Sequence, residues 1–287
     1  MGLFFSFLSA VLSSSKDLVS KRLAFRLDST ASTYASFAYA LPFYMIALIA
    51  MSLFGWETVT LSASFWLLVL LRSITDTMAE WLKMHAFEHG DISIVASFFS
   101  LSPLFLLITS PLITGDQLAP LGALALVIVV IGSLLLVYRP TSHGWRRQKK
   151  AIFLAIAAAI FFSLNSCFDR LAVQEGNPVF AGFTMTLLSA LFLFPLIIRS
   201  RPRLESLRAQ RTGLLIRAVL EFTFMSSKLI ALQYLTATDV VGIQRLALVF
   251  SIVGGYVFFK EEDLPRRLSA GILILAGVFL ITWLQLT

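Results

Sequence analysis

Charged residues recur at helical spacing inside two strongly apolar stretches of the chain. The stretch 63–86, ASFWLLVLLRSITDTMAEWLKMHA, carries four charges: Arg72, Asp76, Glu80 and Lys83. Steps of four, four and three residues place these side chains on one face of a helix. An ionisable group inside a bilayer costs about 2.5–3.5 kcal/mol or more, so such groups normally face the protein interior or a water-filled cavity. The stretch therefore predicts a membrane helix whose charged face lies toward the protein interior or a water-filled cavity.

The stretch 213–235 repeats this arrangement in the second half of the chain. It contains Arg217, Glu221 and Lys228, each 145 residues after its counterpart at 72, 76 and 83. Two matching charged stripes predict one central polar cavity that each half of the chain lines once.

The overall composition places these stretches in a membrane. Of the 287 residues, 58% are hydrophobic and 14% are charged, and the mean hydropathy is +0.86. A soluble domain has about 25% charged residues, so we predict an all-α integral membrane protein. The net charge of +7 does not indicate nucleic-acid binding, because the basic residues flank the spans. The lone Cys167 excludes an intramolecular disulfide.

Ten transmembrane helices are predicted, each with about 20 mostly apolar residues. They cover 2–20, 31–53, 63–86, 92–113, 117–138, 150–172, 178–198, 213–235, 239–259 and 267–285, and the longer connections are 139–149 and 199–212. Sixteen Lys and Arg residues lie in the first, fifth, seventh and ninth connections, and none lies in the even-numbered ones. The positive-inside rule therefore places the odd-numbered connections in the cytoplasm and both termini outside.

An internal repeat divides the chain into two halves. Matches at the offset of 145 include Ala86 with Ala231, Leu101 with Leu246, Phe105 with Phe250 and Gly132 with Gly277. Asp17 matches Asp169 at a slightly larger offset. Because each half has an odd number of spans, the halves have opposite orientations, as in many secondary transporters. The predicted units are a first five-helix repeat at 1–138, a basic linker at 139–149 and a second repeat at 150–287.

The segments that carry the repeat resemble a known family. They are ASFFSLSPLFLLITSPLITGDQLAPLGALALVIVVIGSLLLV at 96–137 and YLTATDVVGIQRLALVFSIVGGYVFFKEEDLPRRLSAGILILAGVFLI at 234–281. A small-residue stretch, an acidic turn and a glycine-punctuated last helix are similar to the drug/metabolite transporter superfamily, in its ten-helix EamA-like branch. The resemblance implies a membrane transporter and says little about its substrate. Many relatives are thought to keep their termini in the cytoplasm, whereas the loop charges here place them outside.

Seven cations and five acids lie inside the predicted spans. The cations are Lys16, Arg72, Lys83, Arg170, Arg217, Lys228 and Arg245, and the acids are Asp17, Asp76, Glu80, Asp169 and Glu221. One interpretation is a structural network in which Arg72–Asp76 and Arg217–Glu221 pair one turn apart within their helices. The other is that the remaining cations bind substrate. Both interpretations stay open at this point.

Arg245 is the leading candidate for substrate contact. Its counterpart in the first half is Ser100, so the repeat gives it no symmetric structural duty. Plant phosphate translocators of the same superfamily resemble this segment and carry a basic pair that holds substrate phosphate; this chain keeps half of that pair, as Gln244-Arg245. Arginine suits bidentate capture of a carboxylate or phosphate. The other candidate substrate-binding residues are Gln244, Lys83, Lys228, Arg72, Arg217, Asp76, Glu80 and Glu221, and the candidate coupling or gating residues are Lys16, Asp17 and Asp169.

The predicted function is transport of a small charged or zwitterionic metabolite, bearing a carboxylate or phosphate, by alternating access. No nucleotide-binding loop is present, so we expect coupling to protons, ions or an exchanged solute, and no cofactor. A flippase for a lipid-linked phosphate or sugar is the alternative, and an intramembrane enzyme is a more distant one.

The remaining expectations concern metals, partners and location. The segment 85–89, HAFEH, matches the H-x-x-E-H zinc pattern, but no third ligand follows, so no metal site is expected. The expected partners are a small-molecule substrate and the lipid bilayer, without nucleic acid, for a monomer or homodimer. The compact chain and the family resemblance favour a bacterial inner membrane.

Overall fold

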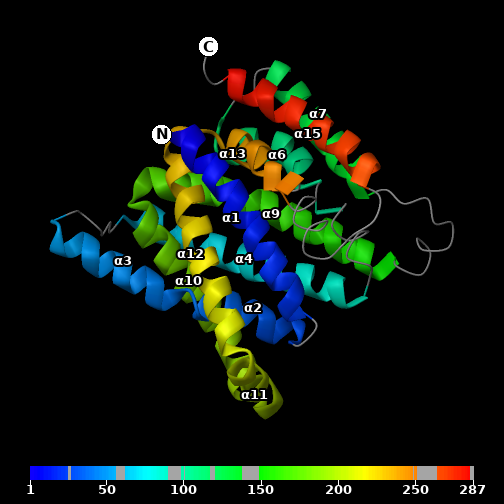
Figure 1. Ribbon diagram of the computed structural model, residues 1–287. Coiled ribbons are helices and arrows are strands. Elements are labelled where there is room, and N and C mark those ends of the chain that lie inside the picture. Colours follow the sequence, from blue (N-terminus) through cyan, green and yellow to red (C-terminus); the bar gives the residue numbers. More distant parts are fainter. Residues whose placement is uncertain are drawn as a thin grey trace.

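The computed structural model describes residues 1–24, 27–55, 62–89, 98–99, 101–116, 120–137, 149–247, 249–250 and 264–284, and its elements there are helices (Figure 1). The first half contains α1 (Gly2–Ala24), α2 (Ser29–Ala38), α3 (Leu41–Leu53), α4 (Ala63–His89), α6 (Ser102–Ile113) and α7 (Pro120–Val137). The second half contains α9 (Lys149–Glu175), α10 (Pro178–Ile198), α11 (Arg201–Ala209), α12 (Arg211–Tyr234), α13 (Ala237–Gln244) and α15 (Leu264–Leu284).

Four helical segments are long and apolar enough to cross a membrane: Gly2–Ser20, Ser29–Leu53, Lys149–Glu175 and Pro178–Ile198. Shorter apolar helices cover Ser102–Ile113, Pro120–Gly132 and Gly271–Leu280. The long helices α4 and α12 carry the two charged stripes. These elements agree with a helical membrane protein. The count of ten spans stays a prediction, because the predicted spans 92–113, 117–138, 239–259 and 267–285 lie partly outside the described residues.

Three pairs of long helices pack along one another: α4 with α9, α1 with α12, and α7 with α15. The first two pairs form the body of the molecule, and α7 and α15 lie together at one side of it (Figure 1). Gly132 and Gly277 mark a close approach of α7 and α15. A Cβ on Gly277 would meet Val129 Cγ2 at 2.5 Å, and one on Gly132 would meet Ile274 Cγ1 at 2.9 Å. The two glycines that match in the sequence repeat thus allow the same helix contact.

The predicted span 31–53 is broken into two helices. α2 ends at Ala38 and α3 begins at Leu41, with Pro42 in its first turn. Proline has no N–H to donate to the preceding turn, so it begins a helix more readily than it continues one. Pro103 has the same place in the first turn of α6.

The predicted connection 199–212 contains a helix, α11, which the sequence analysis did not anticipate. Pro202 lies in its first turn. Arg203 Nε donates to Asp28 Oδ2 at 2.6 Å, while Asp28 Oδ1 accepts from the Ala31 backbone N–H at 2.7 Å and caps α2. The basic connection is therefore tied to the start of α2 by one carboxylate.

Candidate functional site

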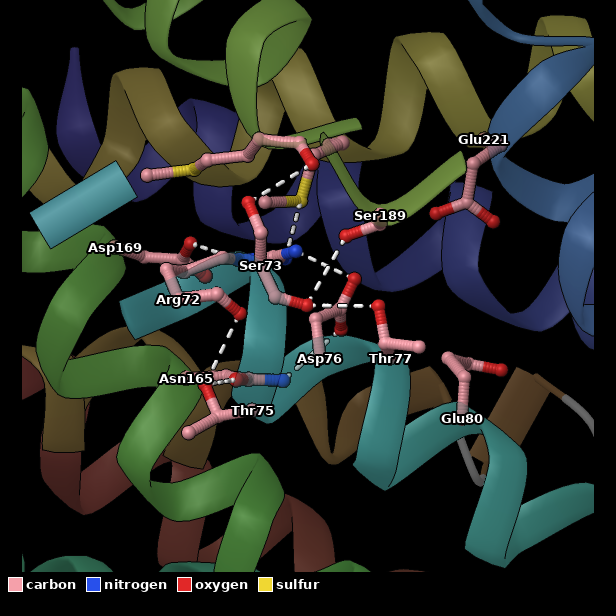
Figure 2. A network of polar contacts seen from close by, with 12 residues as sticks. Arg72, Ser73, Thr75, Asp76, Thr77, Glu80, Asn165, Asp169, Ser189 and Glu221 are labelled. Carbon is pink, nitrogen blue, oxygen red and sulfur yellow. Dashed lines mark hydrogen bonds and ion pairs between the residues drawn. The ribbon is translucent and has the colours of Figure 1, made fainter. Parts of the chain in front are cut away.

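Asp169 on α9 joins a buried charge network with residues of α4 and α12, and Figure 2 shows its contact with Arg72. Its Oδ1 accepts from Arg72 Nε at 2.8 Å, and its Oδ2 accepts from Lys228 Nζ at 2.8 Å. The Asp169 side chain is 0% exposed. One carboxylate thus joins three helices and satisfies two buried cations. Both partners come from the charged stripes that the sequence predicted.

Asp76 and Asn165 extend this network along the contact between α4 and α9 (Figure 2). Arg72 Nη1 lies 2.5 Å from Asp76 Oδ2, which confirms the predicted pair one turn apart on α4. Asn165 Nδ2 donates to Asp76 Oδ1 at 2.9 Å, and Thr75 Oγ1 donates to Asn165 Oδ1 at 2.5 Å. Asn165 lies one turn before Asp169 on α9, just as Asp76 lies one turn after Arg72 on α4. The facing turns of the two helices are therefore joined at both places, Arg72 to Asp169 and Asp76 to Asn165.

Two cations and two acids make up the charges of this network, so its formal charge is zero. Ser73 reinforces the surroundings by donating to the backbone carbonyls of Val69 at 2.7 Å and Met185 at 3.1 Å, which ties α4 to α10. A buried network in which each charge has a partner is a rigid scaffold. This arrangement favours the structural interpretation for Arg72, Asp76, Asp169 and Lys228.

The predicted pair of Arg217 with Glu221 is wrong for the described structure. Glu221 Oε2 lies 3.2 Å from Lys16 Nζ, which comes from α1, and Lys16 also lies over the ring of Phe224, at 4.2 Å from its centroid. Arg217 Nη1 instead donates to the backbone carbonyl of Ser32 on α2, at 3.0 Å. The helix packing decides this outcome, because α1 lies along α12 and brings a second cation to Glu221.

Lys83 and Glu80 pair with each other near the end of α4. Lys83 Nζ lies 2.5 Å from Glu80 Oε1, at the spacing of three residues. The Lys83 ammonium also lies over the Phe162 ring, at 5.3 Å from its centroid. Figure 2 shows Glu80 apart from the Asp169 network, one turn beyond Asp76. Lys83 therefore has a local carboxylate, unlike Lys228, which pairs across helices.

Arg245 differs from the other membrane cations. It caps the C-terminus of α13, its side chain is half-buried, and its Nε is buried without a hydrogen-bond partner. No hydrogen bond or ion pair joins its side chain to the part of the chain that the structure describes. The adjacent Gln244 is held differently, since its Nε2 donates to Ser9 Oγ at 3.0 Å. Among the described residues the Arg245 guanidinium therefore has no internal partner.

Asp17 is an acid of the predicted spans that takes no part in the buried charge network around Asp169. Its side chain is exposed, whereas its neighbour Lys16 is buried. Within the described ranges it makes no hydrogen bond or ion pair. It interacts at longer range with four charges, those of Lys16, Lys83, Glu80 and Glu221, and also with Arg245.

The contact between Arg170 and Asp116 was not predicted from the sequence. Arg170 Nε lies 3.9 Å from Asp116 Oδ2, and Arg170 Nη1 donates to the backbone carbonyl of Leu232. The sequence does show that Arg170 directly follows Asp169 and therefore projects from a different face of α9. A cation on that face can pair only with groups on other helices or turns. This contact fastens α9 to the end of α12 and to the turn after α6.

The two histidines of the segment 85–89 make polar contacts with helix neighbours. His85 Nδ1 lies 3.1 Å from Ser29 Oγ, and His89 Nε2 lies 2.9 Å from Lys150 Nζ. Among the described residues no group of three His, Cys, Asp or Glu side chains could hold a metal ion. The Glu88 side chain lies outside the described part.

Apolar helices around a buried charge network are those of a multi-pass integral membrane protein. The sequence matches the EamA-like transporter family over residues 1–138 and 149–283. The chain therefore belongs to this family, which lies within the drug/metabolite transporter superfamily and whose members are membrane transporters of small molecules. The predicted family, membrane location and transporter class are confirmed.

One solved structure, described only as "Crystal structure of protein", matches with a TM-score of 0.76 and 15% sequence identity. The match covers 99% of this chain and 98% of that chain. At this identity the likeness concerns the fold alone. No curated protein matches the sequence.

Proposed function

We propose that the protein is a secondary transporter of a small metabolite with a carboxylate or phosphate group, and that Arg245 binds this group. The observation that carries the proposal is the state of the seven cations inside the predicted spans, all of which the structure describes. Six of them have a carboxylate or backbone carbonyl as partner, and Arg245 has neither among the described residues. A charge left unpaired in a protein interior is costly, so a functional partner from outside the chain accounts for it.

The backbone around Arg245 supports the same assignment. α13 ends at Gln244, in the predicted span 239–259, and the hydrogen bond from Gln244 to Ser9 fixes that end against α1. In the first half, α6 begins with Leu101 as its N-cap, and Leu101 matches Leu246 in the repeat. Helices interrupted at corresponding points of two repeats are where secondary transporters place their binding sites.

The helix pairs support two inverted repeats at 1–138 and 150–287, joined by 139–149. If the halves are exchanged, the contact of α4 with α9 becomes the contact of α12 with α1, and both are among the most extensive in the molecule. The contact of α7 with α15 remains the same contact, because these two helices change places. This symmetry supports alternating access, in which one group of helices rocks against the other around a fixed site.

The charges of the connections support a cytoplasmic location for the odd-numbered loops, including the one that contains α11, and external termini. We assign the protein to a bacterial inner membrane on its compact form and its family. Transport is coupled to protons, ions or an exchanged solute in this proposal.

A thermal-shift experiment on the purified protein in detergent tests the role of Arg245. The panel contains carboxylates, phosphate esters, amino acids, amines and lipid-linked phosphates. A ligand at about 100 times its Kd stabilises the folded state by about 2.7 kcal/mol. We expect a carboxylate- or phosphate-bearing compound to raise the melting temperature of the natural chain but not that of Arg245→Gln.

Arg208→Gln is the matched control, because it removes the same charge from an exposed position on α11. It should respond like the natural chain. A response that survives in Arg245→Gln would show that Arg245 does not bind the anionic group. Stabilisation by lipid-linked phosphates alone would replace the metabolite transporter with a flippase.

A further inference from the structure

Asp17 lies near the end of the apolar part of α1, where charges of three helices act on its carboxylate. The charges that act on it come from α1, α4 and α12, namely Lys16, Lys83, Glu80 and Glu221. Its side chain is exposed, yet a carboxylate that faced lipid would be strongly disfavoured. We therefore take Asp17 to face the charges of the neighbouring helices rather than the lipid.

The charges that act on Asp17 already form ion pairs with one another. Lys16 pairs with Glu221 at 3.2 Å, and Lys83 pairs with Glu80 at 2.5 Å. Each pair is formally neutral. Among the described charges inside the predicted spans, one carboxylate, Asp17, and one guanidinium, Arg245, remain without a hydrogen bond or ion pair.

Asp17 and Arg245 interact electrostatically without forming an ion pair. Gln244 contacts Ser9, which places the end of α13 beside α1 two turns before Asp17. Eight residues of α-helix span about 12 Å, so Asp17 lies about that far along α1 from the contact with Gln244. An interval therefore separates two opposite charges.

The opposite charges of Asp17 and Arg245 determine which charge type of ligand can bind between them. A simple anion would bind Arg245 but be repelled by Asp17, and a simple cation would meet the reverse. A zwitterion places its ammonium group against Asp17 and its anionic group against Arg245, so both unpaired charges gain a partner.

We infer that Asp17 is a specificity-determining residue and that the substrate is a zwitterion, with a primary amine bound by Asp17 and a carboxylate or phosphate bound by Arg245. This inference rests on the proposed function and adds the second half of its binding site. The same chemistry occurs in free amino acids and phosphoethanolamine and in the headgroup of an ethanolamine lipid.

Calorimetric titration with matched ligands tests the inference. Phosphoethanolamine carries both charges, ethyl phosphate carries only the anionic group, and ethylamine carries only the amine; L-alanine and propionate form a second matched set. We expect the natural chain to bind the zwitterion of a set about tenfold or more tighter than its anion, the difference that a hydrogen bond to a charged group supplies. Lysophosphatidylethanolamine and lysophosphatidic acid repeat the comparison for a lipid source.

Three variants decide the outcome. Asp17→Asn should lose the preference for the zwitterion while it still binds the anion, and Asp17→Glu should restore the preference. Glu175→Gln, which removes an exposed carboxylate that contacts Ser62 and Ser64, should keep it. Melting curves without ligand confirm that each variant is folded.

Each possible result is informative. If Asp17→Asn keeps the preference while Arg245→Gln loses all binding, the inference about Asp17 is overturned and the proposed function stands. If Arg245→Gln binds every ligand as the natural chain does, the proposed anion site fails as well. Binding only of the lysolipid pair, with the same dependence on Asp17, would retain the zwitterion and identify its source as a lipid. Absence of binding by all classes would overturn both proposals.

Discussion

Asp169 and Asp17 occupy matching places in the two halves of the sequence, but their surroundings differ. Asp169 is fully buried and accepts hydrogen bonds from Arg72 and Lys228. Asp17 is exposed, and the residues that correspond to those two cations, Arg217 and Lys83, are engaged elsewhere. The Asp169 carboxylate is paired with two cations of the protein, and we call this the closed locus. The Asp17 carboxylate has no such partner among the described residues, and we call this the open locus.

The first cause of this difference is a single position on the charged stripes. Glu80 in the first half corresponds to Met225 in the second, at the offset of 145. Glu80 pairs with Lys83, whereas Met225 offers no carboxylate, so Lys228 extends to Asp169. The Met225 sulfur instead lies 3.7 Å from Arg72 Nη2.

The second cause is the residue that precedes each aspartate. Lys16 precedes Asp17, and Phe168 precedes Asp169. Lys16 forms the ion pair with Glu221, so Arg217 does not. Phe168 carries no charge and does not compete for Asp76, which therefore pairs with Arg72. Two changes in the repeat thus convert one symmetric design into a scaffold in one place and a candidate binding site in the other.

The largest effect is expected at the closed locus. Asp169→Ala leaves Arg72 and Lys228 buried without their shared carboxylate, and removing one member of a buried ion pair costs about 3–5 kcal/mol. Asp17→Ala removes a carboxylate that bonds to none of the described residues, so we expect a change of about 0.5 kcal/mol or less. Chemical denaturation of both variants in detergent measures the free energy of unfolding. Equal losses would remove the distinction between the two loci.

The next effect comes from making the open locus resemble the closed one. Glu80→Met gives the first half the residue that the second half has at position 225, and it releases Lys83 to pair with Asp17. We expect the affinity for phosphoethanolamine to fall about tenfold, equivalent to about 1.4 kcal/mol, because Asp17 is then occupied. Calorimetric titration measures this change, with Glu175→Gln as the control. An unchanged affinity would mean that Lys83 does not decide whether Asp17 is open.

The smallest effect is expected at Gln244, next to the open locus. Gln244→Leu removes the hydrogen bond to Ser9 Oγ, and one such bond contributes about 0.5–1.5 kcal/mol. Because this amide is used within the protein, ligand affinity should fall less than in Arg245→Gln. Thermal melting and titration of the same samples measure both quantities. A loss of affinity as large as that of Arg245→Gln would make Gln244 a ligand contact.

Much of the fold could be predicted from the sequence, because apolar length determines where a chain crosses a membrane. The predicted span 178–198 coincides with α10, and 63–86 lies within α4. The break between α2 and α3 was missed because hydropathy continues through Pro42. The helix α11 was missed because a nine-residue polar segment carries no apolar stripe of sufficient length.

The charged residues of the site could also be predicted, but their partners could not. Helical spacing indicated the stripe on α4 and the local pair of Arg72 with Asp76. Whether Glu221 pairs with Arg217 or with Lys16 depends on which helices are neighbours, and a local pattern in one sequence does not contain that information. The same holds for the contact of Asp169 with Lys228.

We propose that Arg245 binds the substrate and that Asp169 stabilises the fold. Counterflow of labelled phosphoethanolamine or L-alanine into proteoliposomes, together with the melting temperature of the same preparations, tests it most directly. For Arg245→Gln we predict transport at background, with a melting temperature within about 3 °C of the natural chain, roughly 1 kcal/mol for a protein of this size. Retained transport, or a fall in melting temperature as large as that of Asp169→Ala, would overturn this division of roles.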